Sequence, residues 1–472
     1  MQKILLFIAS LFYFNSLFAK DEIKSWQGIH ETPLSRLEQQ FADPPVEFAN
    51  HVIWGWEGKM DKKTICNDLD SIKKKGFRAI IFEAGYKLPF KYLSEEWFKA
   101  IRTGVLEAKK RGMKVWIIDE GKYPSGFAGG KFSQERPDLR MQALVIGDTI
   151  QIKRGEVMTN HKIAPEIISA VAVSTSGAPN RTVAINNGEI SFNAGLDDWK
   201  ILLVKSDFRT AVTRAVNNPN GGKDATNSLC DYLNPVAVQQ FIDWTHEQYK
   251  KYLGKELGTT VLGFRGDEPD YAHLPWTPSI VQTFKDTKGY DPTPYLASFF
   301  TTSPTIQEQR VKADYWDVWS SLFATHFFKL QADWCAANGV AHITHLNKEH
   351  EMPACVKAEG DYFRNLSKVQ IPGVDAIWNQ IWPGTLNDFP KLASSVAHVY
   401  GKPRAFSESF AAYHISPTIP QAKFVVDHQI ARGINFFEFM FWLAGSKHRN
   451  WMSDPGMKGL NEYTNRTTYL MS

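Results

Sequence analysis

Short apolar segments alternate with amphipathic segments along most of this chain, and the alternation restricts the fold more than any other feature. Each apolar segment is bounded by Gly, Pro or polar residues, which is typical of buried strands. Segments with helical spacing follow most of them, as the crossovers between parallel strands require. Outside one β-rich stretch we count eight strands, which begin near His51, Phe77, Met113, Val261, Val340, Gly373, Pro403 and Ile434.

Eight strand and helix units predict a (β/α)₈ barrel of the TIM type. Helices are expected over 61–75, 94–111, 235–257, 305–338, 386–400 and 420–432. A doubly wound open sheet is the alternative, but the glycines of loop 120–130 are not spaced as a phosphate-binding fingerprint. A change to β-branched alternation after the third strand predicts an inserted β-rich module. The expected division is 1–19 signal peptide, 20–140 first part of the barrel, 141–213 inserted module and 214–472 second part of the barrel.

The first residues predict export. Lys3 precedes an apolar run and then small and polar residues around Ala19, the pattern of a cleavable secretory signal. A membrane anchor is the alternative, but the apolar run is short for a bilayer and no second long run follows. We therefore expect an exported protein, periplasmic or secreted, with no membrane span in its mature form.

Cysteine and charge patterns exclude other classes of protein. The four cysteines form no C-x-x-C pair, so they predict neither a zinc site nor a disulfide framework. A formal net charge of +4 without a basic patch gives no support for a nucleic-acid partner. The chain is 13% aromatic, and indole faces stack well on the C–H faces of sugar rings. The expected partner is therefore an oligosaccharide or polysaccharide substrate.

Polar and aromatic residues gather where the predicted strands end. The segment from Val261 stops at two adjacent carboxylates, Asp267 and Glu268, followed by Pro269. In a (β/α)₈ barrel the carboxyl ends of the strands form one mouth, where active sites are built. The candidate site residues are Trp54, Trp56, Glu83, Asp119, Glu120, Asp267, Glu268, His345, Asn379, Gln380, Glu408, Glu438 and Trp442.

Paired carboxylates beside aromatic residues are what glycosidic cleavage requires, one as acid and one as base or nucleophile. Glu268 and Glu408 are the predicted catalytic pair, because each directly follows an apolar strand beside small or polar residues. Asp267 is the alternative to Glu268. His345 is either a substrate ligand or part of the pocket wall, and the other candidates are expected to bind substrate hydroxyls or form ion pairs. No serine stands in a nucleophile elbow, Ser125 included.

Several short motifs also resemble a known enzyme family in their order and spacing. They are Trp54-Gly-Trp56, Gly76-Phe77, Glu96-Trp97, Tyr123-Pro-Ser-Gly126, Gly266-Asp-Glu268, Trp276-Thr-Pro278, Gly289-Tyr-Asp291, Glu359-Gly-Asp361, Ser407-Glu408 and Gly433-Ile-Asn435. Their ordered run, from about His51 to Ser472, resembles the α-L-rhamnosidase-type glycoside hydrolases of family 106. The chain resembles the N-terminal catalytic portion, since family members continue into β-sandwich domains.

The resemblance implies an inverting hydrolase with Glu268 as general acid and Glu408 as general base. It also implies a calcium ion that holds sugar hydroxyls, which suits oxygen ligands. Here the chain departs from the family, because Gln380 stands where a carboxylate is expected. The sequence assigns no metal ligand and predicts no other cofactor.

We therefore expect an exported glycoside hydrolase that acts on α-L-rhamnosides of plant or microbial polysaccharides. A non-catalytic carbohydrate-binding barrel, a glycosidase for another sugar and a carbohydrate lyase are the alternatives. A glycosidase, unlike a binding protein, needs two opposed carboxyls, about 6.5–9.5 Å apart for inversion or about 5–5.5 Å apart for retention.

Overall fold

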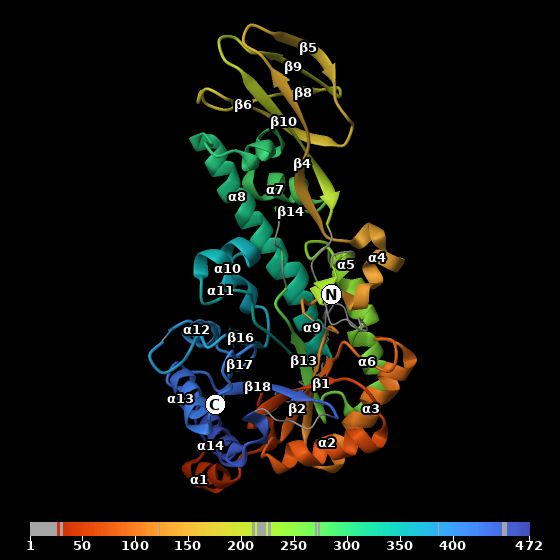
Figure 1. The fold of residues 1–472 in the computed structure, drawn as a ribbon, viewed down its shortest axis with the longest axis vertical. Helices are drawn as coiled ribbons and strands as arrows, with labels where there is room; N and C mark the ends of the chain where they lie inside the picture. The colour runs from red at the N-terminus through yellow and green to blue at the C-terminus, as the bar shows by residue number, and fades with distance from the viewer. Residues whose placement is uncertain are drawn as a thin grey trace, which may run out of the picture.

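Eight parallel strands close into a barrel in a computed structural model of the chain (Figure 1). The structure describes residues 26–28, 32–121, 123–209, 213–214, 223–224, 228–269, 271, 274–385, 387–445 and 451–472, so the predicted signal segment lies outside it. The barrel strands are β1 His51–Trp56, β2 Ala79–Ala84, β3 Lys114–Ile118, β13 Val261–Gly266, β15 Ala341–Thr344, β16 Ile371–Ala376, β17 Phe406–Ser409 and β18 Phe436–Leu443. Each neighbouring pair is parallel and β18 closes on β1, so the predicted TIM-type barrel is confirmed.

Helices surround the barrel in the crossovers. They include α2 Lys62–Lys74, α3 Glu95–Lys110, α5 Pro235–Trp244, α6 His246–Leu253, α8 Ile306–Leu322, α9 Lys329–Ala337, α12 Pro390–Val399, α13 Ile419–Ile430 and α14 Met457–Leu470. The other α-helices are α1 Leu34–Ala42, α4 Lys131–Glu135, α7 Ile280–Lys288, α10 Met352–Glu359 and α11 Tyr362–Leu366. Side-chain caps at Asp61, Ser94, Thr305 and Thr418 begin four of them. Within the described residues, no helix combines the length and apolarity needed to cross a bilayer.

Two predicted helices are interrupted. The helix expected over 235–257 breaks at Thr245, whose φ of −114° and ψ of −84° lie outside the helical region, so that α5 and α6 are separate. The Thr245 hydroxyl donates to the carbonyl of Phe241 at 2.7 Å, which lets a side chain satisfy the last turn of α5. The helix expected over 305–338 passes through a π-helical segment, Phe323–Phe328, between α8 and α9.

Two further sheets form a β-rich module at one end of the molecule, away from the barrel (Figure 1). Its strands are β4 Gln142–Ile152, β5 Val157–Lys162, β6 Ile167–Ser174, β7 Arg181–Thr182, β8 Ile185–Asn186, β9 Glu189–Asn193 and β10 Trp199–Phe208, and a separate pair is β11 Thr213–Arg214 with β12 Lys223–Asp224. The larger sheet also takes β14 Pro275–Trp276, which follows β13 in the chain and pairs with β4. The module therefore enters the chain between β3 and α5, as predicted, and one strand from beyond β13 ties it to the barrel.

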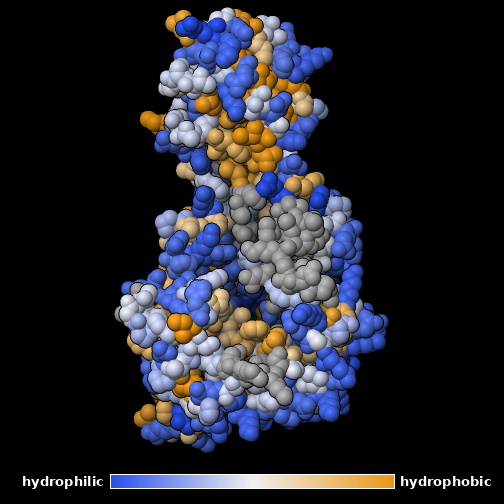
Figure 2. All heavy atoms as spheres, viewed as in Figure 1, coloured by the Kyte–Doolittle hydropathy of each residue, from blue (hydrophilic) through white to orange (hydrophobic). Residues whose placement is uncertain are grey.

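The β-rich module differs from the barrel in its surface. Hydrophobic surface gathers on the module in Figure 2, and its strands β4 and β10 expose Ile146 and Phe208. Its anchor to the rest of the chain includes a hydrogen bond of 3.0 Å from the Ala297 amide, in the 3₁₀ segment Thr293–Phe300, to Ser169 Oγ on β6.

Side chains of the barrel strands alternate between two cores. Ile53, Ile81, Trp116, Ile343 and Phe406 pack inside the barrel, whereas Val52, Trp54, Phe82 and Val374 pack in the layer between the strands and the helices. This alternation decides which strand residues reach the mouth, because only inward-facing positions near the carboxyl ends can do so.

Candidate active site

Three carboxylates lie side by side inside the barrel near its mouth. Asp375 on β16, Glu408 on β17 and Glu438 on β18 are partners in the strand register, and all three are buried. Neighbouring strands lie about 4.8 Å apart, so three ionised groups here would repel one another strongly. The row requires either protons or a buried cation.

Arg265 on β13 is that cation. Its guanidinium is fully buried and contacts Asp267 at 2.7 Å, Glu438 at 3.2 Å and Glu408. The sequence reasoning missed Arg265, although a basic residue inside an apolar strand, two positions before a carboxylate, is a usable signal. Arg265 makes a compact ion-pair network that joins the ends of β13, β17 and β18.

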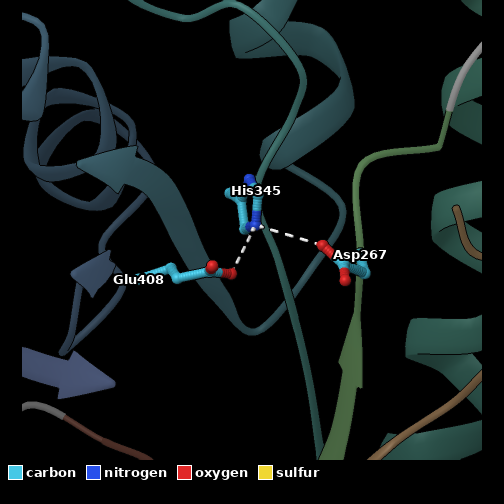
Figure 3. Close-up of side chains that lie close together, drawn as sticks. All are labelled: Asp267, His345 and Glu408. Atoms are coloured by element: carbon cyan, nitrogen blue, oxygen red, sulfur yellow. Dashed lines mark ion pairs between the residues drawn. The ribbon is translucent and has the colours of Figure 1, made fainter. Parts of the chain in front are cut away.

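His345 follows β15 and lies between carboxylates (Figure 3). Its Nε2 is 3.5 Å from Asp267 Oδ1 and 3.4 Å from Glu408 Oε2, and its Nδ1 is 3.5 Å from Glu349 Oε1. Burial lowers the pKa of His345, but the hydrogen bonds to Asp267, Glu349 and Glu408 outweigh it and raise that pKa well above the ordinary value. The carboxylates therefore favour a proton on His345, while Arg265 Nη2, 3.0 Å from Nε2, opposes it.

Glu268 and Asp375 approach His345 from another side. The three residues each place one ligand-type atom within 4.8 Å of the others. Part of Glu268 reaches solvent, yet dense packing around its carboxyl raises its pKa to about 8, opposed by His345 and reinforced by Asp267 and Glu408. Glu268 thus holds a proton at neutral pH. Its backbone has a φ of 35°, in the left-handed region that non-glycine residues rarely adopt and that occurs at functional sites.

Asp267 differs sharply from its neighbour. Although burial raises the pKa of Asp267, Arg265 and His345 hold it below the ordinary range. Asp267 is thus ionised and engaged in ion pairs. It cannot deliver a proton near neutral pH, which favours Glu268 over Asp267 as the acid.

Asp375 is a second residue that the sequence reasoning missed. Burial, then Glu408, raise the pKa of Asp375 well above its ordinary value. Its Oδ1 is buried and has no hydrogen-bond partner among the described residues. A carboxyl that holds a proton and points an unpaired atom into the mouth is suited to bind a ligand hydroxyl.

A loop after β3 holds the turn that carries Asp267 and Glu268. Ser125 Oγ donates to Asp119 Oδ1 at 2.6 Å and accepts the Asp267 amide at 2.6 Å, while the Ser125 amide donates to the Asp267 carbonyl at 2.8 Å. Asp119 is buried, and its pKa rises to about 7. Asp119 Oδ1 thus serves this clamp, and contact of Asp119 with a substrate hydroxyl stays a prediction.

Glu120 also belongs to this loop and not to the mouth. Its carboxylate accepts the amides of Gly121 at 2.6 Å, Gly129 at 3.1 Å and Ala128. Burial raises the pKa of Glu120 to about 8, against these hydrogen bonds. Because both oxygens serve loop amides, the prediction that Glu120 binds substrate is wrong.

The remaining polar candidates lie at the mouth. Glu83 faces inward beside Gly55, where a Cβ atom would lie 3.3 Å from Glu83 Oε2. Asn379 and Gln380 are partly exposed in the loop after β16; Asn379 Oδ1 accepts the His414 amide at 3.0 Å, and Gln380 Nε2 is 2.9 Å from His350 Nδ1. Their contact with substrate stays a prediction.

The three tryptophan candidates do not reach the mouth. Trp54 and Trp56 are fully buried between the barrel and the helices, where both pack on Phe82, and Trp54 Nε1 donates to Asp68 of α2 at 3.2 Å. Trp442 is the register partner of Trp54 and is buried in the same layer. The prediction that they stack on sugar is wrong, because alternate strand residues face the helices.

Calcium does not fit the described residues. The two clusters that could hold a cation are Asp267 with His345 and Glu408, and Glu268 with His345 and Asp375. Calcium takes six to eight oxygen ligands, whereas each cluster offers two carboxyls and an imidazole. Arg265 already supplies the positive charge next to the first cluster. We therefore derive no chemical step through a metal.

A separate cavity of about 450 Å³ opens at the other end of the barrel, beside Gly76, Met113 and Asn465. The strands begin at that end, and none of the strand-end carboxylates lines the cavity. The chemistry therefore belongs to the mouth and not to this cavity.

Comparisons with known proteins agree with the fold. A solved rhamnosidase from Novosphingobium sp. PP1Y is similar in structure, with a TM-score of 0.69, 15% identity and coverage of 93% of this chain and 61% of that one. A protein of Formosa agariphila named "Putative beta-glucuronidase" is 24% identical over 90% of this chain and 39% of its own length. The chain thus spans less than two thirds of each of these proteins. The model of family 106, described as alpha-L-rhamnosidase, matches residues 158–468, a range that holds Arg265, Glu268, His345 and Glu408. The chain therefore belongs to glycoside hydrolase family 106.

Proposed function

We propose that this chain carries the active site of an inverting hydrolase that cleaves α-L-rhamnosides, with Glu268 as general acid and Glu408 as general base. The observation that carries the proposal is a carboxyl with a raised pKa and an ion-paired carboxyl that both lie beside the His345 imidazole. Glu268 holds a proton at neutral pH, while Glu408 forms ion pairs with Arg265 and His345.

The acid step needs a proton on Glu268. Cleavage of a glycosidic bond leaves an alkoxide unless the leaving oxygen is protonated as the bond breaks. Glu268 gives its proton to that oxygen, and the bond electrons leave with the departing alcohol. The raised pKa of Glu268 makes this transfer available up to about pH 8.

The base step needs an ionised carboxylate that a water can reach. Glu408 accepts a proton from water as the water oxygen attacks the anomeric carbon on the face opposite the leaving group. The Glu408 carboxyl pairs with Arg265, and its Oε2 lies 3.4 Å from His345 Nε2. The cycle ends with a proton on Glu408 and a negative charge on Glu268, and exchange with solvent restores both.

The charge of the mouth supports a neutral sugar. Five carboxyls converge there, namely Asp267, Glu268, Asp375, Glu408 and Glu438, and the described cations Arg265 and His345 already contact carboxylates. A uronate, as the name of the Formosa relative would imply, would bring another negative charge to this set. A rhamnoside carries no charge, so we favour the sugar that the family description names.

The mouth also separates the enzyme from a carbohydrate-binding protein. Cleavage of a glycosidic bond needs one carboxyl that donates a proton and one that accepts a proton. A binding protein needs only hydrogen bonds to its sugar, so a glutamate with a raised pKa in the mouth favours the enzyme. Export stays a prediction from residues 1–19.

Turnover of aryl and disaccharide α-L-rhamnosides tests the proposal. Glu408→Gln should lower kcat by about two orders of magnitude or more on both substrates. Glu268→Gln should suppress the disaccharide far more than an activated aryl rhamnoside, whose leaving group needs no proton. In the unsubstituted chain kcat/KM should fall as pH rises through about 8, since the acid then loses its proton. Equal losses on both substrates in Glu268→Gln, or a first product that retains its anomeric configuration by NMR, would contradict the assignment.

A further inference from the structure

Two loops at the mouth carry a set of aromatic side chains that the chemistry above does not use. They follow β16 and β17, the strands that supply Asp375 and Glu408. We name the set Trp378, Trp382, Tyr413 and His414 the aromatic wall. Trp378 is 51% exposed, and its ring centroid lies 6.0 Å from that of His414; Trp382 and Tyr413 pair at 5.8 Å.

The two loops are fixed to each other. The Trp378 amide donates to the Ala411 carbonyl at 3.1 Å, and the His414 amide donates to Asn379 Oδ1 at 3.0 Å. Trp378 and Asn379 have φ values of 57° and 56°, a left-handed conformation that bulky residues rarely adopt. The fold holds a large indole in an unfavourable backbone state and leaves half of it in water, an arrangement found where a residue is presented to a ligand.

The inner end of the aromatic wall lies near Asp375. The Tyr413 hydroxyl is buried and has no hydrogen-bond partner among the described residues, and the same holds for Asp375 Oδ1. Burial raises the pKa of Tyr413, and the negative charge of Asp375 raises it further. Two unpaired polar atoms therefore lie where the wall meets the site, and each such atom calls for a partner that the protein itself does not supply.

We propose that the aromatic wall is a binding subsite for the sugar ring on the leaving-group side of the cleaved bond. The proposal rests on the proposed function, because it places the cleaved sugar at Glu268 and Glu408. The next ring then extends outward along the wall. A pyranose has one face of C–H groups that packs on an aromatic face, and a rim of hydroxyls that can bond to the Tyr413 hydroxyl and Asp375. The substrate class is therefore a saccharide whose rhamnose is attached to another sugar, rather than a rhamnoside of a small alcohol.

Trp378→Ala provides the test, with two substrates that differ only beyond the cleaved bond. An α-L-rhamnosyl fluoride has no second ring, and a rhamnosyl-glucose disaccharide has one. For the disaccharide, kcat/KM should fall about tenfold, mainly through KM, since an aromatic contact is worth up to about a factor of ten. For the fluoride it should stay within about twofold, and Trp378→Phe should restore most of the loss on the disaccharide.

A matched control is Tyr400→Ala. Tyr400 is 50% exposed and ends α12, in the crossover that leads to the start of β17 and therefore away from the mouth. Tyr400→Ala should leave kcat/KM unchanged for both substrates. Equal effects of Trp378→Ala on both substrates, or none on the disaccharide, would overturn the subsite.

Binding without turnover separates this proposal from the proposed function. Calorimetry with the disaccharide and Glu268→Gln protein should show binding that Trp378→Ala weakens about tenfold, whether or not the unsubstituted chain hydrolyses any substrate. Absence of turnover in the unsubstituted chain would reject the function alone. Disaccharide affinity that is undetectable, or unchanged by Trp378→Ala, would reject the subsite.

Discussion

Arg265 decides the charge states of the residues around it. A guanidinium buried inside the barrel pairs with Asp267, Glu408 and Glu438, and it stays charged because its own pKa is far above neutral. Burial lowers the pKa of Arg265, but these carboxylates outweigh the effect and raise it. One residue thereby keeps Asp267 ionised and supplies the cation next to Glu408. Glu438 faces the opposite balance, since burial raises its pKa to about 7 in spite of Arg265.

Replacing Arg265 with Met should move the acidic limb of the pH profile. The carboxylates that pair with Arg265 would lose their cation, so the pH below which activity is lost should rise. Three uncompensated buried carboxylates should also lower the free energy of unfolding by about 3–5 kcal/mol. The pH dependence of kcat/KM checks the first effect and denaturant unfolding the second.

Arg265→Lys is the control that keeps the charge. It should shift the acidic limb less than Arg265→Met, and its folding can be compared directly. An acidic limb that stays in place in both variants would remove Arg265 from the proposed mechanism.

The sequence identifies site residues at the ends of strands better than site residues inside strands. Asp267, Glu268 and Glu408 stand out because carboxylates follow apolar runs. Arg265 and Asp375 lie within the runs, and whether they face the mouth or the helices depends on a register that only barrel closure fixes. The same uncertainty explains why Trp54 was assigned to the mouth although it faces the helices.

Among the elements, the loop after β3 has the most specific task. Its hydrogen bonds run inward to the Glu120 carboxylate and across to the Asp267 backbone through Ser125. Gly126, with a φ of 95°, allows the close approach of Tyr232, since a Cβ there would lie 2.5 Å from its ring. The loop is therefore a rigid support for the turn that presents Glu268.

Ser125→Ala should loosen that turn without removing a catalytic group. The Asp267 amide and Asp119 would each lose a partner, which typically costs about 1–3 kcal/mol of stability. We expect kcat to fall about tenfold with the disaccharide, because displacement of a catalytic group by about 1 Å is costly. Steady-state kinetics and thermal unfolding together measure both effects.

Ser394→Ala on α12 is a matched control for Ser125→Ala. Ser394 is also a buried serine, and its hydroxyl lies within hydrogen-bond reach of the carbonyls of Lys391 and Arg432, on the helical side of the barrel. Ser394→Ala should lose about as much stability as Ser125→Ala, but its kcat should be unchanged. If both variants lose kcat equally, the effect of Ser125 is general destabilisation and not positioning.

Element types are also what the sequence predicts well, since periodicity and caps are local properties. All eight barrel strands form near their predicted starts, and the caps at Ser94 and Thr305 begin α3 and α8. The pairing of β14 with β4 depends on contacts between distant segments. No local pattern contains that information.

For the whole molecule, buried carboxyls that hold protons connect folding with pH. Burial raises the pKa of Asp119, Asp231 and Glu438 to about 7, and that of Glu120 and Glu268 to about 8. The unfolded chain binds these protons only below about pH 4. Buried His51, His246 and His342 act in the opposite sense, because burial lowers their pKa values and the unfolded chain alone protonates them below about pH 6.5.

The free energy of unfolding should therefore fall as pH rises from about 6.5 to about 8. In this window the histidines of the unfolded chain are already neutral, while the folded carboxyls still release protons. Each group with a raised folded pKa contributes stability that is complete below its unfolded pKa and is lost as pH rises through its folded pKa, at up to about 1.4 kcal/mol per pH unit.

Asp231 provides the specific test, since it lies outside the catalytic network and accepts hydrogen bonds from Thr277 at 2.7 Å and from the Leu233 amide at 3.0 Å. Urea unfolding at several pH values should show a shallower decline for Asp231→Asn. Asp61→Asn, at an exposed helix cap whose pKa is lowered, should keep the original slope. A stability that is constant or rises across this window would show that the buried carboxyls are ionised in the folded chain, and the same result would remove the basis for Glu268 as a proton donor.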